Sequence, residues 1–141
     1  MKKLFLLVLF LVPSLAYATT YYRFPIVKVI DGDSIKIQVS FLPPELGNTL
    51  ILREYGIDTP EIGGKAKCSA EAALAQKAKD FTELSIATAT HHSVVLIKWD
   101  KYGGRVLGDI KVDGKSLKDL LLANGLAVEY SGSGPRHDWC N

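Results

Sequence analysis

The sequence has few of the side chains that build zinc sites. It contains three histidines and two cysteines among 141 residues. Zinc centres need several such side chains at ligand spacing, but His91 and His92 are adjacent and His137 lies near the end of the chain. We therefore expect no zinc site and three surface histidines.

Long apolar runs are absent apart from one at the N-terminus. Leu4 to Leu15 is almost wholly apolar, follows Lys2 and Lys3, and precedes Ala16-Tyr17-Ala18, which fits a small-x-small cleavage pattern. The run is shorter than the roughly 20 residues that a spanning helix needs. We predict a signal peptide over 1–18, with a membrane anchor as the alternative. We accordingly expect an exported protein, periplasmic or secreted, with no stable membrane association after cleavage.

The sequence also lacks an excess of charge of one sign. The formal net charge is +2, and the first 18 residues carry two lysines and no acid, so the remainder is neutral. Any attraction to phosphate must then come from a local basic site rather than from a global field. Repeats, low-complexity tracts and long linkers are absent, so we predict a single domain over 19–141.

Both cysteines, Cys68 and Cys140, lie beyond the predicted signal. An even number of cysteines in an exported chain indicates a disulfide. Two separate buried thiols are the alternative. We predict a Cys68–Cys140 bond that fixes the C-terminal tail to the start of the first helix.

Apolar alternation and turn residues predict a mainly β, α+β chain. The expected strands cover 23–30, 35–39, 50–57, 94–99 and 105–112. A helix is expected from Ser69 to about Thr88, with Ser69 as its cap. Ser116 should cap a shorter helix that ends at Gly125. Five strands with a helix between the third and the fourth, and a short C-terminal helix, match the five-stranded OB-fold barrel. Periodicity alone leaves other small β-barrels possible.

Four acidic residues follow predicted strand ends or turns. Asp31 and Asp33 flank Gly32, where Asp31 has the alternative role of making the turn, whereas Asp33 adds nothing to it. Asp58 and Glu61 bracket Thr59-Pro60, for which a capped loop is the alternative. Carboxylates bind hard cations, and a carboxylate can orient or deprotonate an attacking water.

Two arginines complete this pattern. Arg53 lies inside an apolar strand, where an arginine usually has an anionic partner, either a bound phosphate or one of these carboxylates. Arg105 follows Gly103-Gly104 and by itself resembles a surface arginine. Guanidinium groups bind phosphate through two donors, so the combination predicts a metal-dependent phosphodiesterase.

The order of these motifs resembles the staphylococcal nuclease (thermonuclease) family. The resemblance extends over about 27–130, and its motifs are Val29-Ile30-Asp31-Gly32-Asp33-Ser34-Ile35, Leu52-Arg53, Gly56-Ile57-Asp58-Thr59-Pro60-Glu61, Asp100-Lys101-Tyr102-Gly103-Gly104-Arg105 and Asn124-Gly125-Leu126-Ala127. It implies a Ca²⁺-dependent endonuclease acting on DNA, RNA or both, in single-stranded or locally open form. A monomer is expected. The alternative is a non-catalytic OB-fold module that binds single strands.

The resemblance also implies the metal site. Asp33 and Asp58 would bind Ca²⁺, with the Thr59 backbone carbonyl as a further ligand, and Asp31 would lie near the metal. Glu61 would act on the attacking water.

The remaining implied roles concern the substrate. Arg53 and Arg105 would hold the scissile phosphate, and Lys101 and Tyr102 would line the nucleotide site. Tyr130 lies near an aromatic position of that site, although its spacing differs. Further departures are the extra Gly104 before Arg105 and the short tail after residue 130, where the predicted disulfide would replace the tether of a longer helix.

Overall fold

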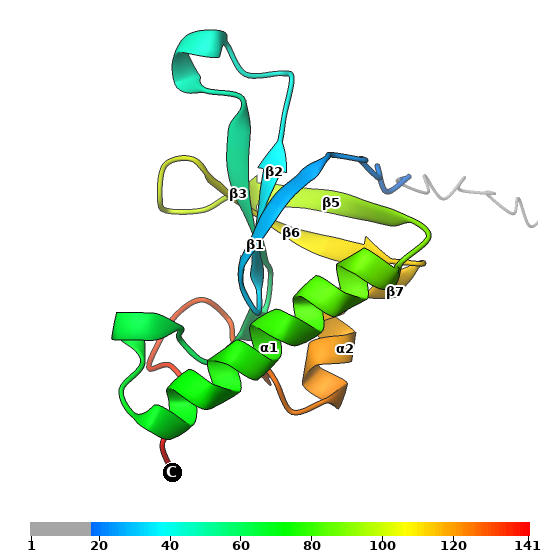
Figure 1. Cartoon of the computed structure of the whole chain (residues 1–141). Helices are drawn as coiled ribbons and strands as arrows, with labels where there is room; N and C mark the ends of the chain where they lie inside the picture. The colour runs from blue at the N-terminus through cyan, green and yellow to red at the C-terminus, as the bar shows by residue number, and fades with distance from the viewer. Residues whose placement is uncertain (1–17) are drawn as a thin grey trace, which may run out of the picture.

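The computed structural model describes residues 18–141 and has an α+β architecture that is mainly sheet (Figure 1). The predicted signal peptide lies outside the described residues, except for Ala18, and stays a prediction. No helix within residues 18–141 combines the length and the apolar character needed to cross a membrane.

Five strands form the main path of the sheet, in the order β1-β2-β3-β6-β5. Their bounds are β1 Ile26–Asp31, β2 Ser34–Gln38, β3 Thr49–Glu54, β5 His92–Trp99 and β6 Arg105–Val112. β3 and β6 are parallel, and the other neighbours are antiparallel. Each of the five predicted strands corresponds to a strand of this path. Three short strands lie outside it: β4 Ile57–Asp58 pairs with β8 Val128–Glu129, and β7 Lys115–Ser116 pairs with β6.

The predicted five-stranded OB-fold barrel is confirmed in part: residues 18–141 form the mainly β, α+β fold with two helices, but the sheet does not close. The edge strands β1 and β5 do not pair, and the N-terminal segment reaches β5 through one bridge between Tyr22 and Val94. Pro25 follows that bridge and directly precedes β1. Because proline has no N–H to donate to a ladder, the bridge and β1 do not join into one long strand.

The predicted strand over 50–57 is two strands. Gly56 has a φ of +89°, a conformation that favours glycine. The chain therefore turns there, and β4 leaves the main sheet to pair with β8 through Ile57 and Asp58. This turn carries Asp58 away from the β3 ladder and into the site described below.

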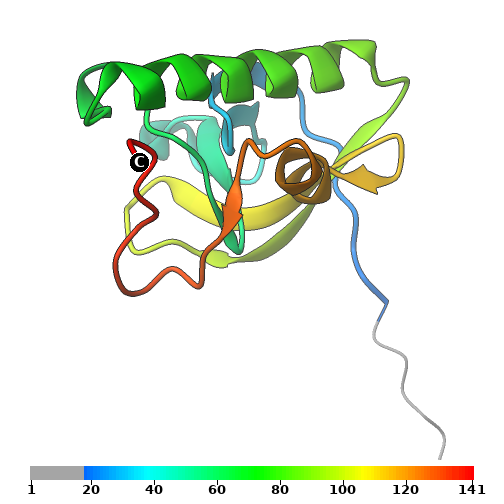
Figure 2. The ribbon, with the colours of Figure 1, turned by 90° about the horizontal axis from the view of Figure 1, so that it is seen from below.

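Helix α1, Ser69–Thr88, has the predicted bounds but a different cap. Cys68 is the capping residue, and its Sγ accepts a hydrogen bond from the Glu71 N–H at 3.4 Å. The helix lies along one side of the sheet (Figure 2). Its buried residues include Ala75, Ala78 and Thr82, so small side chains allow a close approach to the β1–β2 turn.

Gly32 is the point of closest approach between that turn and α1. A Cβ at Gly32 would lie 2.7 Å from the Ala78 Cβ, which real contacts do not allow. The Thr82 hydroxyl donates to the Gly32 carbonyl at 2.7 Å. The helix thus fixes the position of the turn that carries Asp31 and Asp33.

The second helix, α2 Leu117–Ala123, packs against β6 and α1. Ser116 precedes it, but its hydroxyl donates to Asp109 at 2.7 Å instead of capping the helix. The core joins the sheet to the helices and contains Ile35, Ile37, Leu52, Ile57, Val94, Ile110, Leu117 and Leu121.

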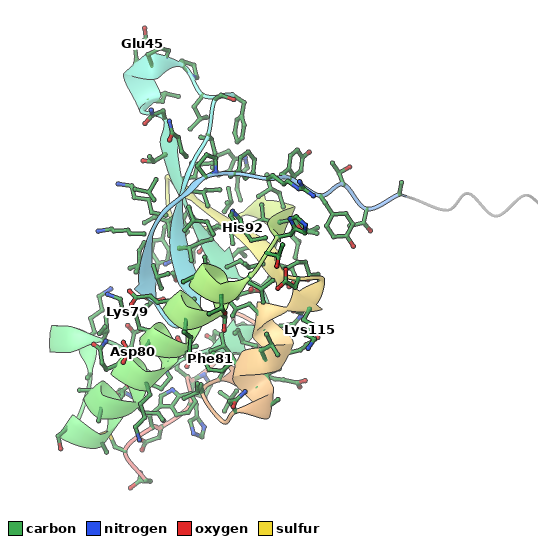
Figure 3. The ribbon with its side chains drawn as sticks, turned by 45° about the vertical axis from the view of Figure 1, so that its right-hand side comes forward. Glu45, Lys79, Asp80, Phe81, His92 and Lys115 are labelled. Atoms are coloured by element: carbon green, nitrogen blue, oxygen red, sulfur yellow. A yellow bond between two sulfur atoms is a disulfide. The ribbon has the colours of Figure 1, made fainter. Side chains whose placement is uncertain are left out.

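Two short 3-10 helices lie in connections, η1 Pro44–Leu46 and η2 Gly63–Lys65. The β2–β3 connection, which includes η1, projects from the sheet with Glu45 at its far end (Figure 3). η2 lies between β4 and α1, in the segment that holds Glu61.

Candidate active site

Two buried carboxylates face each other at the end of the sheet. Asp33 and Asp58 are each 1% exposed. One guanidinium nitrogen of Arg53, Nη2, lies 2.9 Å from Asp33 Oδ2 and 3.5 Å from Asp58 Oδ1. The pairing of Arg53 with carboxylates, expected as one alternative, is therefore present, and it joins the two predicted metal-binding residues.

Burial raises the pKa of Asp33 from 3.8 to about 8, because a buried carboxylate loses its hydration. The charge of Arg53 opposes this rise, and the Asp31 carboxylate adds to it. Asp31 also accepts a hydrogen bond from the Asp33 N–H at 3.3 Å, and the Ser34 hydroxyl donates to Asp33 at 2.9 Å. Asp33 therefore needs a nearby positive charge to remain ionised.

A third arginine, Arg136 of the C-terminal tail, contacts Asp58 and Glu61. Its Nε donates to Asp58 Oδ1 at 2.8 Å, and its Nη2 donates to the same oxygen. Its Nη1 donates to Glu61, and Nη2 lies 3.4 Å from the Thr59 carbonyl oxygen. Burial lowers the pKa of Arg136, but the hydrogen bonds to Asp58 and Glu61 outweigh it and raise that pKa.

An open cleft of ≈ 740 Å³ lies over these groups. The predicted site residues that line it are Asp31, Arg53, Glu61, Lys101, Tyr102, Arg105 and Tyr130. Asp33 and Thr59 do not line it, and Asp58 lines a smaller adjoining pocket together with Glu61 and Arg136. The structure thus brings the two predicted phosphate-binding arginines to one cleft, and Arg53 connects that cleft to the buried carboxylates of Asp33 and Asp58.

The loop from Asp100 to Arg105 forms one wall of the cleft. The Asp100 N–H donates to the Arg105 carbonyl at 3.0 Å, and the two side chains form an ion pair. The Arg105 guanidinium carbon lies 4.6 Å from the Tyr102 ring centroid. The additional Gly104, with a φ of +73°, lies in the turn, and Arg105 still lines the cleft.

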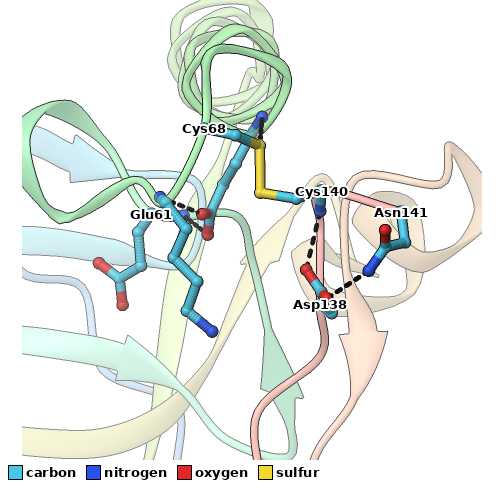
Figure 4. The surroundings of a disulfide bond; sticks show 7 residues. Glu61, Cys68, Asp138, Cys140 and Asn141 are labelled. Carbon is cyan, nitrogen blue, oxygen red and sulfur yellow. Dashed lines mark hydrogen bonds between the residues drawn. A yellow bond between two sulfur atoms is a disulfide. The ribbon is translucent and has the colours of Figure 1, made fainter.

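Glu61 is attached to the start of α1 through its backbone. The buried Glu71 carboxylate accepts hydrogen bonds from the Lys67 N–H at 2.7 Å and the Glu61 N–H at 3.1 Å. These backbone donors, with that of Lys67 first, lower the pKa of Glu71. Figure 4 shows this contact beside the Cys68–Cys140 disulfide.

That disulfide confirms the predicted pairing of the cysteines. It joins residues 72 positions apart, with 6.1 Å between the Cα atoms. It places the end of the tail beside the segment that holds Glu61 (Figure 4). The tail therefore belongs to the surroundings of the site.

The predicted metal-binding residues fit a hard cation in charge and donor type. Asp33 Oδ2 and Asp58 Oδ2 are buried and accept no hydrogen bond, although the former is ion-paired with Arg53. Buried carboxylate oxygens of this kind suit Ca²⁺, which binds oxygen ligands. Within residues 18–141, however, no group of three or more His, Cys, Asp or Glu side chains is arranged to hold a metal ion. The predicted set thus has two carboxylates and one backbone carbonyl.

Several residues of the site are absent from the sequence-based prediction. Besides Arg136 and Glu71, they include the cleft residues Tyr55, Lys98 and Trp99. Trp99 is 60% exposed, and the Lys98 Nζ lies 5.1 Å from the Tyr55 ring centroid. Trp99 directly precedes the Asp100 motif, which is a usable signal. Arg136 has a weaker one, since it lies four residues before the cysteine predicted to reach α1.

The cleft gathers basic, aromatic and acidic side chains on a small α+β domain. The chain belongs to the staphylococcal nuclease homologue family, whose model matches residues 51–138, more than half of the sequence, and this match indicates a nuclease-type or nucleic-acid-binding module. The predicted resemblance is confirmed. The matched range includes Arg53, Asp58, Glu61 and Arg105 but not Asp33. Among curated proteins, no sequence matches this one closely enough to count as a relative.

Proposed function

We propose that the protein is a Ca²⁺-dependent nuclease that hydrolyses phosphodiester bonds of DNA, RNA or both. One observation supports this most directly: Arg53, Arg105 and Glu61 line one cleft, with the carboxylates of Asp33 and Asp58 buried beside them. A binding surface needs no buried pair of carboxylates next to its phosphate contacts, whereas a metal-dependent phosphodiesterase uses carboxylates to hold its cation.

The arginines would bind the scissile phosphate. Arg105 offers a guanidinium oriented against the Tyr102 ring, and Arg53 is oriented by Asp33. Donors placed in advance around developing negative charge lower the barrier to phosphoryl transfer. Glu61, whose backbone is attached to Glu71, would orient the attacking water and accept its proton.

Asp33, Asp58 and the Thr59 carbonyl would hold the cation. When bound, Ca²⁺ would supply charge that neutralises a phosphate oxygen. Asp31 accepts the Asp33 N–H and so keeps the turn in place.

The wall of the cleft indicates the form of the substrate. Trp99, Tyr102 and Tyr55 expose aromatic rings beside Lys98 and Lys101. Unpaired bases stack on aromatic rings, and lysines follow the phosphate backbone. We therefore propose single-stranded or locally open nucleic acid as the substrate. The Cys68–Cys140 bond supports a place of action in an oxidising compartment.

A binding module without catalysis is the second candidate. It is favoured by the contacts of Arg136, which already neutralise Asp58 and Glu61. In a module of this kind the same cleft would bind strands and leave them intact.

Cleavage assays separate the two. Purified protein is incubated with single-stranded DNA, duplex DNA and RNA, with CaCl₂ or with chelator, and the products are sized. We expect shorter products with CaCl₂ only, and their loss in Glu61→Gln. Strands that stay uncut under all conditions but migrate more slowly in a gel, because the protein is bound to them, would favour the binding module.

A further inference from the structure

The tail residue Arg136 binds the groups that the proposed function assigns to the cation and to the water. Its guanidinium contacts Asp58 Oδ1, the Thr59 carbonyl oxygen and Glu61. We propose that Arg136 is a built-in competitor of the divalent cation, which has to displace it before the site can work. Arg136 thereby sets the cation concentration that the protein requires. This inference rests on the proposed function.

The hydrogen-bond donors around Asp58 Oδ1 show why Arg136 and a cation do not readily bind this oxygen at the same time. This oxygen accepts hydrogen bonds from Nε and Nη2 of Arg136, and Nη2 of Arg53 lies 3.5 Å away. A carboxylate oxygen has two lone-pair positions. Arg136 uses both. Asp58 Oδ2 accepts no hydrogen bond, so a cation at Oδ2 alone would not meet Arg136. A cation that also binds Oδ1 or the Thr59 carbonyl oxygen has to replace donors of Arg136.

The charges lead to the same conclusion. Arg136 lies against Asp58 and Glu61, and a cation bound by Asp58 would lie beside the same two side chains. Two positive groups held that close in a partly buried site repel each other. Binding of either one therefore weakens binding of the other.

The tail keeps Arg136 close to the site without burying it. Before Arg136, β8 pairs with β4 and the Tyr130 N–H donates to the Gly56 carbonyl at 2.9 Å. After it, Cys140 is bonded to Cys68. A group confined in this way has a high effective concentration. Its side chain is still 38% exposed, so it can leave the carboxylates without unfolding of the domain.

Calorimetric titration with CaCl₂ measures the competition directly. A cation that binds only the state in which Arg136 has moved away has its affinity reduced by the fraction of that state, so Arg136→Ala should lower the Ca²⁺ dissociation constant about tenfold or more. Arg136→Lys keeps the positive charge but cannot bind both carboxylates in the same geometry. Its Ca²⁺ dissociation constant should lie between those of Arg136→Ala and the unaltered protein. Arg23→Ala removes the same charge from an exposed residue away from the cleft and should leave the constant near that of the unaltered protein.

Trypsin provides a second measurement on the unaltered protein. The protease must take the Arg136 side chain into its own acidic pocket, which the contacts with Asp58 and Glu61 oppose. Saturating CaCl₂ should speed cleavage after Arg136 several-fold, read by mass spectrometry after reduction. Cleavage after Arg23 serves as the internal standard and should not change.

Equal Ca²⁺ dissociation constants for the unaltered protein and Arg136→Ala would overturn the inference, as would absence of Ca²⁺ binding by both. Should Arg136→Ala fail to fold, the trypsin measurement decides: an unchanged rate after Arg136 overturns the inference. Tighter Ca²⁺ binding by Arg136→Ala without any cleavage of nucleic acid would support the competition and reject the proposed nuclease activity.

Discussion

Arg53 and Asp33 form an ion pair with 2.9 Å between Nη2 and Oδ2, in which the carboxylate is 1% exposed. Such a partner cannot be removed without leaving a buried carboxyl group uncompensated. Arg53 therefore stabilises the fold and would also bind the phosphate, whereas Arg105 pairs with Asp100 near the surface of the cleft.

The two arginines should consequently behave differently when replaced. Arg53→Ala is expected to lose turnover and also about 3 kcal/mol of unfolding free energy, as when one partner of a buried pair is deleted. Arg105→Ala should lose about 100-fold in turnover while keeping a nearly unchanged melting temperature. Initial rates and urea denaturation measure both. Normal turnover in folded Arg105→Ala would remove this residue from the proposed mechanism.

Trp99 tests the proposed single-stranded substrate. Stacking on an aromatic ring contributes about 1–3 kcal/mol per base, so Trp99→Ala should weaken binding of a single-stranded oligonucleotide about fivefold or more. Fluorescence anisotropy in the presence of chelator measures binding without cleavage. Phe41→Ala removes another exposed aromatic ring, outside the cleft, and is the matched control. Equal losses in both variants would argue against a role for this wall.

Glu54 should make stability depend on pH. It is buried, its Oε1 accepts the Ile110 N–H at 2.9 Å, and its Oε2 has no partner. Burial raises the pKa of Glu54 well above 4.5, against the opposing Ile110 hydrogen bond. At pH values above the pKa that Glu54 has in the unfolded chain, the folded chain binds more protons than the unfolded chain. The contribution of protonated Glu54 to the unfolding free energy is therefore complete below that pKa. It is lost as pH rises above it, by about 1.4 kcal/mol per pH unit.

Glu54→Gln keeps the acceptor for Ile110 but cannot ionise. The unfolding free energy of this variant should thus increase relative to that of the unaltered protein as pH rises from 4 toward neutrality. Urea denaturation at several pH values within that range gives both curves. Parallel curves would show that Glu54 does not titrate with folding.

Reduction of the Cys68–Cys140 bond should lower the melting temperature. Closure of a 72-residue loop contributes about 4 kcal/mol in the chain-entropy treatment. Arg53, Glu61 and Arg105 lie outside the tail, so the reduced protein is expected to cleave at temperatures where it stays folded. Thermal scans and cleavage assays with and without reductant measure this. An unchanged melting temperature would mean that the bond adds nothing to stability.

The sequence reveals the parts of the site that lie in short local motifs. Asp33, Asp58 and Glu61 follow turns, and Arg53 is conspicuous as a charge within an apolar strand. Each of these could be predicted from a few neighbouring residues. Their roles remain predictions, but the structure brings them to one place.

The parts that could not be predicted depend on contacts between distant segments. Arg136 reaches Asp58 across 78 residues, and nothing in the tail itself indicates this partner. The predicted barrel is confirmed only in part for a similar reason, because its closure depends on how the segment around Pro25 meets β5. The break at Gly56 was missed since an isolated glycine inside an apolar run also occurs in continuous strands.

The parallel pairing of β3 with β6 has a consequence for the timing of folding. Ile51 lies opposite Arg105 in that register, and the whole of α1 and β5 separates the two strands in the chain. Pairing of such distant segments is slow to nucleate, because the entropy of the long intervening loop is lost first. A nascent or partly folded chain therefore has no assembled cleft. Any activity of this cleft can begin only after β3 and β6 have paired, so the chain is inactive while it is being synthesised.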